Sequence, residues 1–76
     1  MSKMPYSPPM HPTLAAFAKL VRRGRFAKGN LSQSTLGHQV GVTRQTIIGI
    51  EQGNDTSLST AVEIARALDV SLDSLK

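Results

Sequence analysis

Residues 31–53 read LSQSTLGHQVGVTRQTIIGIEQG, and this stretch decides the fold because two short helical patterns meet in it at a glycine. Leu36 and Val40 lie four positions apart in the first pattern, and Ile47 and Ile50 lie three apart in the second. Both spacings place apolar side chains on one face of a helix. Because neither segment is long enough to form a stable helix alone, we expect the two helices to form one rigid unit.

The residues around the glycine predict a sharp turn between these helices. Ser32 and Thr43 stand at the two expected N-caps, where a hydroxyl oxygen accepts a hydrogen bond from a first-turn N–H group. Gly41 suits the left-handed conformation that ends a helix, and Val42 can then turn into the core. Gly37 lies inside the first helix, where glycine costs about 1 kcal/mol relative to alanine. We expect that a side chain there would obstruct the close crossing of the second helix.

The flanking sequence predicts further helices on both sides. Upstream, we expect a helix over residues 13–26, with Leu14, Phe17 and Val21 on its buried face, and then a turn over residues 27–31.

Downstream, a polar loop over residues 54–56 leads to Ser57, which is the expected N-cap of a helix over residues 58–68 with a clear apolar stripe. A short fifth helix is expected over residues 71–75. The sequence shows no strand pattern.

Length and composition bound the class of protein. A chain of 76 residues has room for one domain with a small core. We expect such a domain to have modest stability, which dimerisation would raise. Residues 1–12 hold all four prolines, so we expect a flexible arm there and one folded domain over residues 13–76. The chain has no cysteine, no apolar run that could span a membrane and no signal-peptide pattern. A cytoplasmic location without membrane contact is expected.

The net charge of +4 is unevenly distributed. Residues 1–50 contain seven basic side chains and no acidic one, whereas residues 51–76 contain five acidic and two basic ones. A basic half of this kind suits a polyanion such as nucleic acid. The alternative interpretation is that the basic residues of the first helix form its solvated face; they are Lys19, Arg22, Arg23, Arg25 and Lys28.

The sequence offers little for catalysis or metal binding. His11 and His38 are far apart, with no carboxylate or thiol pattern near either of them. No nucleophile, base and orienting acid form a plausible set, and no glycine-rich phosphate loop is present. We therefore expect no enzyme activity, no cofactor and no metal.

The motifs of the central stretch continue to the end of the chain in a fixed order. They are Leu31-Ser32-Gln33, Leu36, Val40-Gly41-Val42, Thr43-Arg44-Gln45-Thr46-Ile47 and Ile50-Glu51-Gln52-Gly53, followed by Ser57-Leu58, Ile64-Ala65-Arg66-Ala67-Leu68 and Val70-Ser71-Leu72-Asp73-Ser74-Leu75. In this order and spacing the chain resembles the Cro and phage-repressor type helix-turn-helix family over residues 14–76. The resemblance implies an all-α, compact five-helix domain of the lambda-repressor type.

The resemblance also implies how DNA would be read. In this family the second helix of the motif lies in the major groove, and its N-terminal side chains contact base edges. The matching positions here are Arg44 and Gln45, with Ile48 and Gly49 one turn later. Arginine can give two hydrogen bonds to guanine, glutamine can pair similarly with adenine, and isoleucine can contact a thymine methyl group. Ile48 has the alternative of burial against a helix or a dimer surface.

Contacts to the phosphate backbone are expected from four residues. The family commonly places a glutamine at the position of Gln33, against the phosphates and the recognition helix. Thr43 and Thr46 carry hydroxyls that can donate to phosphate, although capping and packing explain them almost as well. Lys28 lies near the entry to the motif. Such contacts position a protein on DNA without reading its sequence.

Relatives often pair the acid at Glu51 with an arginine of the first helix in a partly buried bridge. Arg25 is the candidate partner here. The spacing between Arg25 and Gln33 is one residue longer than the family's usual spacing, which leaves Arg22 as an alternative. Residues 54–56 also depart from the family, because they offer Asp55 where relatives often carry a basic phosphate contact, and the chain ends just past the fifth helix.

Together these features predict a sequence-specific DNA-binding transcriptional regulator, a repressor that binds a palindromic operator in double-stranded DNA as a homodimer. Two alternatives stay open. One is an antitoxin that binds its toxin protein and autoregulates its operon, with Met4, Tyr6 and Met10 of the arm as the toxin-binding surface. The other is a helix-turn-helix fold that serves only as a protein-interaction scaffold.

Overall fold

The computed structural model describes residues 11–75, which fold into four α-helices and one turn of 3₁₀-helix with no strand in this range. The elements are α1 (Pro12–Ala27), α2 (Gln33–Val40), α3 (Arg44–Glu51), α4 (Leu58–Leu68) and η1 (Leu72–Leu75). The all-α class is confirmed. Residues 1–10 of the expected arm, including Met4, Tyr6 and Met10, lie outside the described residues.

The prediction of five helices was wrong, because the last segment is a single 3₁₀ turn. A left-handed residue, Asp69 with φ 57°, ends α4 and separates it from this turn. The Ser71 Oγ accepts a hydrogen bond from the Asp73 N–H at 3.1 Å and so starts η1. Four residues are too few to offset the cost of nucleating an α-helix, and short segments of this kind close with tighter i→i+3 bonds.

The first helix begins at Pro12, one residue earlier than expected. Proline has no N–H to lose at the first helical position, and its fixed φ suits a helix start. His11 is the N-cap, since its Nδ1 accepts a hydrogen bond from the Thr13 N–H at 3.1 Å.

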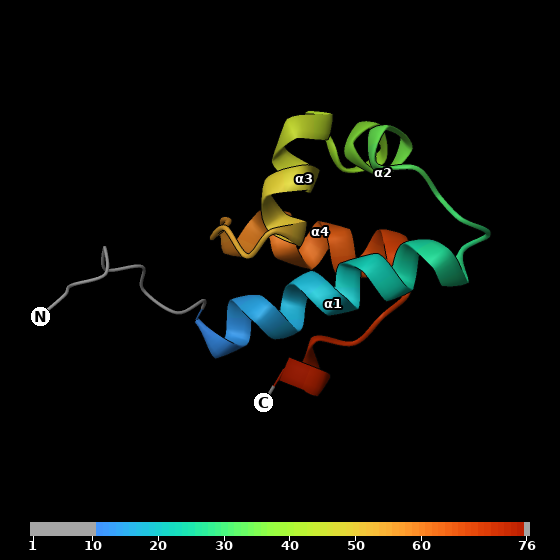
Figure 1. Cartoon of the computed structure of the whole chain (residues 1–76). Helices are drawn as coiled ribbons and strands as arrows, with labels where there is room; N and C mark the ends of the chain where they lie inside the picture. Colours follow the sequence, from blue (N-terminus) through green and yellow to red (C-terminus); the bar gives the residue numbers. More distant parts are fainter. Residues whose placement is uncertain (1–10, 76) are drawn as a thin grey trace, which may run out of the picture.

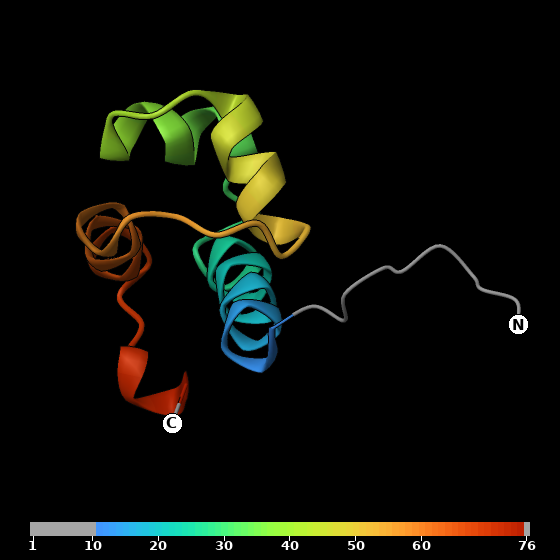
Figure 2. The same cartoon turned by 90° about the vertical axis from the view of Figure 1, so that its left-hand side faces the viewer.

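The helices form two layers around one small core. Figure 2 shows α1 and α4 side by side and nearly end on, with α2 and α3 on one side of them and η1 on the other. Figure 1 shows α2 nearly end on, so that it crosses the direction of α1. The apolar side chains at the centre come from all four α-helices; they are Phe17, Val21, Leu36, Ile47, Ile50, Ile64 and Leu68.

The turn between α2 and α3 has the predicted conformation. Ser32 and Thr43 cap the two helices, and Gly41 ends α2 with φ 79°. A Cβ at Gly37 would lie 2.7 Å from the Val42 carbonyl oxygen. The expected obstruction at Gly37 is therefore present, and the backbone of the turn, rather than the body of α3, is what a side chain would meet.

A second close approach, at Gly24, was missed from the sequence. A Cβ at this buried glycine would lie 2.9 Å from Leu68 Cδ1. The absence of a side chain lets α1 and α4 pack closely at this point. A single glycine in a basic helical segment gives no signal of this, because the partner lies 44 positions away in the sequence.

Candidate nucleic-acid interface

The two ends of α3 have opposite environments. Its first turn is exposed, including Arg44, Gln45 and Thr46, while Ile47 and Ile50 on the other face are buried. Figure 1 shows that this first turn lies at the edge of the molecule, away from α1 and α4, whereas the last turn packs against α1. The helix therefore presents its N-terminal side chains to solvent, while its C-terminal end is held in the domain.

The C-terminal end of α3 is held by a hydrogen-bonded cluster around Glu51, which is 8% exposed. The carboxylate accepts two hydrogen bonds from Arg25, at 2.6 Å from Nε and 2.9 Å from Nη2. It accepts a third from the Gln33 amide at 3.1 Å. Paired N–H groups of one guanidinium match the two oxygens of a carboxylate, which makes this a strong and directional contact. The cluster joins α1, α2 and α3 at one point.

Arg22 and Arg25 have different tasks in this cluster. Arg25 contacts the Glu51 side chain, and its Nη1 also donates to the Leu31 carbonyl at 2.9 Å. The Arg22 Nη1 donates to the Glu51 backbone carbonyl at 2.7 Å, which satisfies one of the free carbonyls at the end of α3. The structure thus places Arg25, the candidate from the sequence, opposite the carboxylate.

The turn between α1 and α2 absorbs the additional residue suggested by the family spacing. Gly29 and Asn30 are both left-handed, with φ 83° and 61°. Glycine adopts this conformation freely and asparagine is among the few other residues that tolerate it. The chain therefore loops out after Lys28 and returns at Leu31 without moving Arg25 off Glu51.

The expected phosphate contacts have distinct surroundings. Gln33 is half-buried, with its amide held by Glu51 beside the N-terminus of α2. Thr43 Oγ1 accepts from the Thr46 N–H at 3.2 Å and lies 3.1 Å from the Thr46 Oγ1, and both threonines remain exposed. Lys28 is exposed at the C-cap of α1. All four have polar groups at or near helix ends.

The two remaining base-reading candidates are less open. Ile48 is half-buried on the flank of α3. A Cβ at Gly49 would lie 2.9 Å from the Asn54 Nδ2, so the space beside this glycine is filled by the side chain of the next loop. The Asn54 N–H also donates to the Gly49 carbonyl at 2.9 Å. Of the four base-reading candidates, Arg44 and Gln45 are therefore the two that are exposed.

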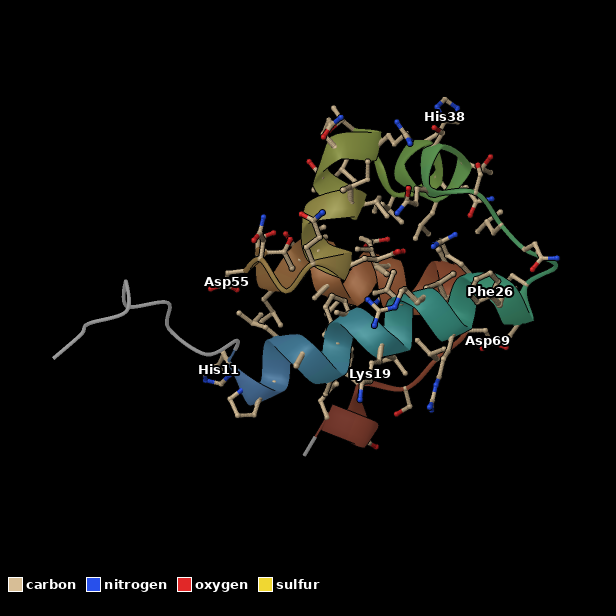
Figure 3. The ribbon with its side chains drawn as sticks, viewed as in Figure 1. His11, Lys19, Phe26, His38, Asp55 and Asp69 are labelled. Carbon is tan, nitrogen blue, oxygen red and sulfur yellow. The ribbon has the colours of Figure 1, made fainter. Side chains whose placement is uncertain are left out.

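The basic residues of α1 do not form one surface. Arg22 and Arg25 are directed toward Glu51, whereas Figure 3 shows Lys19 on the side of α1 that faces η1, away from α3. The interpretation of the basic half as a single face for a polyanion was therefore incomplete, because a helix distributes consecutive residues around its axis.

Other charged and titratable groups lie apart from this site. Figure 3 shows His38 on the outer side of α2 and Asp55 in the loop after α3. Asp55 accepts a hydrogen bond from the Thr56 N–H at 2.8 Å. Within residues 11–75, no group of three His, Cys, Asp or Glu residues could hold a metal ion. No helix in the same range combines the length and apolar character needed to cross a membrane.

Comparisons with known proteins agree on one family. A model described as helix-turn-helix matches residues 21–75. An uncharacterized HTH-type transcriptional regulator from Methanocaldococcus jannaschii is 45% identical over 47 residues, covering 60% of this chain and 71% of that protein. A second such regulator, from Methanothermobacter thermautotrophicus, is 52% identical over 50 residues, covering 64% and 71%. The crystal structure of the restriction-modification controller protein C.AhdI from Aeromonas hydrophila matches with a TM-score of 0.71 at 38% identity, over 83% of this chain and 91% of that one.

Proposed function

Because this chain belongs to the helix-turn-helix family of DNA-binding transcriptional regulators, we propose that it is a repressor that binds a palindromic operator as a homodimer. The observation that carries the proposal is the exposed first turn of α3, held at its other end by the buried Glu51 cluster. A reading helix must keep one orientation while it lies in the major groove, and this arrangement fixes that orientation before DNA arrives.

Arg44 and Gln45 are the proposed base-reading residues. Both are exposed at the start of α3, the end of the helix that contacts base edges in docked helix-turn-helix motifs. Arg44 can donate two hydrogen bonds to one guanine and Gln45 can pair with an adjacent adenine. Ile48, half-buried one turn later, is the proposed contact for a thymine methyl group.

The proposed phosphate contacts are the polar groups that surround this turn. The Thr43 and Thr46 hydroxyls can donate to a phosphate, and Lys28 adds a charge in the α1–α2 turn. Gln33 donates one N–H of its amide to Glu51 and keeps the other N–H for a DNA phosphate. It lies at the N-terminus of α2, where free backbone N–H groups also favour a phosphate. Gln33 would thereby connect the phosphate backbone of DNA directly to Glu51 at the C-terminal end of α3.

An exposed apolar patch supports the dimer. Leu58 is 77% exposed at the start of α4, and it borders a groove of about 260 Å³. The apolar lining of the groove comes from Leu14, Phe17, Ala61, Leu72 and Leu75. A projecting leucine beside an apolar groove is self-complementary under a two-fold axis, since each copy can insert its leucine into the other. Two copies joined there would present two reading helices to half-sites about one helical turn apart.

The decisive experiment is selection of bound sequences from a random duplex pool at physiological salt. The proposal predicts a recovered palindrome with half-sites whose centres lie about 34 Å apart, because a symmetric dimer reads symmetric DNA. Recovery of no consensus, with equal retention of selected and random duplexes, would contradict it.

Arg44→Ala is expected to weaken binding to the selected operator about tenfold per half-site and to relax the preference at one base pair. Lys28→Ala serves as the comparison. It should weaken binding to all sequences alike and reduce the slope of log affinity against log salt by about one. Competition binding with each single-base operator variant measures both effects. Equal losses on all duplexes for Arg44→Ala would remove this residue from the readout.

Leu58→Glu is expected to convert the dimer into a monomer, because a charge would replace the leucine in the apolar groove. Operator affinity should then fall by about 100-fold, since two linked half-site contacts become independent. Sedimentation and operator titration measure the two effects. Ser59→Glu adds the same charge at the next position, also exposed, and should leave both unchanged. A Leu58→Glu protein with the wild-type mass would place the dimer surface elsewhere.

A further inference from the structure

The face of α1 that is turned away from α3 carries a hollow with two free cations at its rim. The hollow has a volume of about 260 Å³ and is lined by Ala16, Lys19, Leu20, Arg23 and Leu75. The four α1 residues follow the spacing i, i+3, i+4, i+7, so they form one stripe along the helix. Ala16 and Leu20, with Leu75 of η1, supply an apolar floor, while Lys19 and Arg23 are exposed.

The cations of this stripe differ from the other arginines of α1. Arg22 and Arg25 are held by Glu51. For Lys19 and Arg23, in contrast, residues 11–75 provide no ion pair and no hydrogen-bond acceptor. Figure 3 shows that Lys19 lies on the η1 side of α1, so that α1 itself separates it from α3. These two charges therefore have no partner within residues 11–75, and they lie on the other side of α1 from a duplex bound at the first turn of α3.

We propose that this stripe binds an acidic amphipathic segment of a partner protein while the helix-turn-helix is on DNA. The spacing of Lys19 and Arg23, as well as their positive charge, selects the partner. Two cations four positions apart on a helix match two carboxylates at the same spacing on a partner helix, and Arg23 can bind one of them with two parallel hydrogen bonds. An apolar side chain between the two carboxylates would fill the hollow. This is the helix-in-groove mode with charged edges.

The position of the stripe gives the contact a role. A partner bound there would not compete with the operator, because the two ligands occupy opposite sides of the domain. The chain would then bind DNA with one face and recruit or be recruited by a second protein with the other. This inference goes beyond the proposed function and can fail while that function stands.

The test uses a labelled helical peptide of about 20 residues, in which glutamates four positions apart flank a leucine. A peptide of the same composition, with its glutamates on the face opposite the leucine, is the control. Both are titrated by fluorescence anisotropy at physiological salt, where distant charges are screened, against the full chain alone and bound to its selected duplex. The protein variants are Lys19→Glu/Arg23→Glu, Arg23→Glu and Arg66→Glu on α4, whose charge change matches that of Arg23→Glu.

The proposal predicts binding of the first peptide that is stronger than that of the control peptide and unchanged by bound DNA. Arg23→Glu should weaken it about threefold and the double variant about tenfold or more, since exposed ion pairs become repulsive, while Arg66→Glu leaves it unchanged. The double variant should retain its thermal unfolding transition and its affinity for the duplex. The proposal would be overturned if the protein did not prefer the first peptide, if Arg66→Glu lost as much affinity as Arg23→Glu, or if DNA displaced the peptide. A change in the sedimentation mass of the double variant would also overturn it, because the stripe would then be a self-association surface.

Discussion

Glu51→Ala is expected to lower the free energy of unfolding by about 3–5 kcal/mol, because it leaves a partly buried arginine without its carboxylate partner. The Glu51 side chain is 6% exposed and that of Arg25 is 13% exposed. Removal of the carboxylate leaves the Arg25 guanidinium partly buried with one acceptor, the Leu31 carbonyl, and leaves the Gln33 amide without its partner. Most of the cost is this uncompensated charge rather than the lost attraction.

Urea unfolding followed by circular dichroism measures this effect. Because a chain of this size has a total stability of only about 4–11 kcal/mol, Glu51→Gln provides a milder variant that keeps an acceptor for Arg25. Glu63→Ala is the control, since its carboxylate lies 3.8 Å from Arg66 Nη1 in an exposed pair, and its loss should change stability by less than about 0.5 kcal/mol.

A double-mutant cycle separates the pair from its surroundings. Arg25→Ala and Glu51→Ala should each be strongly destabilising, yet the double variant should be less destabilised than the sum, by about 1–3 kcal/mol. Strict additivity, or a loss for Glu51→Ala no larger than that for Glu63→Ala, would show that the cluster does not secure α3.

Gly37→Ala is expected to destabilise the protein by about 2–3 kcal/mol, although alanine is the better helix former by about 1 kcal/mol. The added methyl group would lie 2.7 Å from the Val42 carbonyl oxygen and 3.2 Å from the carbonyl carbon and oxygen of Thr43. These are backbone atoms of the turn and of the α3 N-cap, so the clash can be relieved only if α2 and α3 move apart. Urea unfolding and operator titration should both show a loss, because the same movement reorients α3, the proposed reading helix.

Gly49→Ala is the matched comparison, since it also places a methyl group within a short helix. Its Cβ would meet the Asn54 Nδ2 at 2.9 Å, the far end of a flexible side chain that can turn aside. We expect its stability to remain within about 1 kcal/mol of the wild-type value. If Gly37→Ala were as stable as Gly49→Ala, the close crossing at the turn would not be a constraint on this fold.

Much of the fold was predictable because it depends on local chemistry. The caps at Ser32 and Thr43 need only a hydroxyl before a helix, and Gly41 needs only freedom to adopt a positive φ. The bounds of α4 also follow from Ser57 and an apolar stripe. The fifth helix failed on the same local grounds, because periodicity over four or five residues does not reveal whether a segment can bear the cost of nucleation.

The candidate site was predictable only in part. Arg44 and Gln45 could be named because the family resemblance implies contacts from the first turn of the helix after Thr43, and the structure leaves both residues exposed. The surroundings of Gly49 could not be foreseen, because its neighbour Asn54 reaches it through a turn at Gly53 with φ 94°. The Gln33 contact with Glu51 likewise joins residues from two helices whose packing sets the distance.

The sequence by itself determined where the four α-helices lie, where α3 begins and which side chains stand on its first turn, since hydrogen bonding within a few residues controls each of these. Only the tertiary structure decided what the charges of α1 do. Successive arginines on a helix point in different directions, so Arg22 and Arg25 meet Glu51, while Arg23 and Lys19 remain free on the other side. Charge acts over distance in space, and the order of residues along a chain does not specify that distance until the helices have packed.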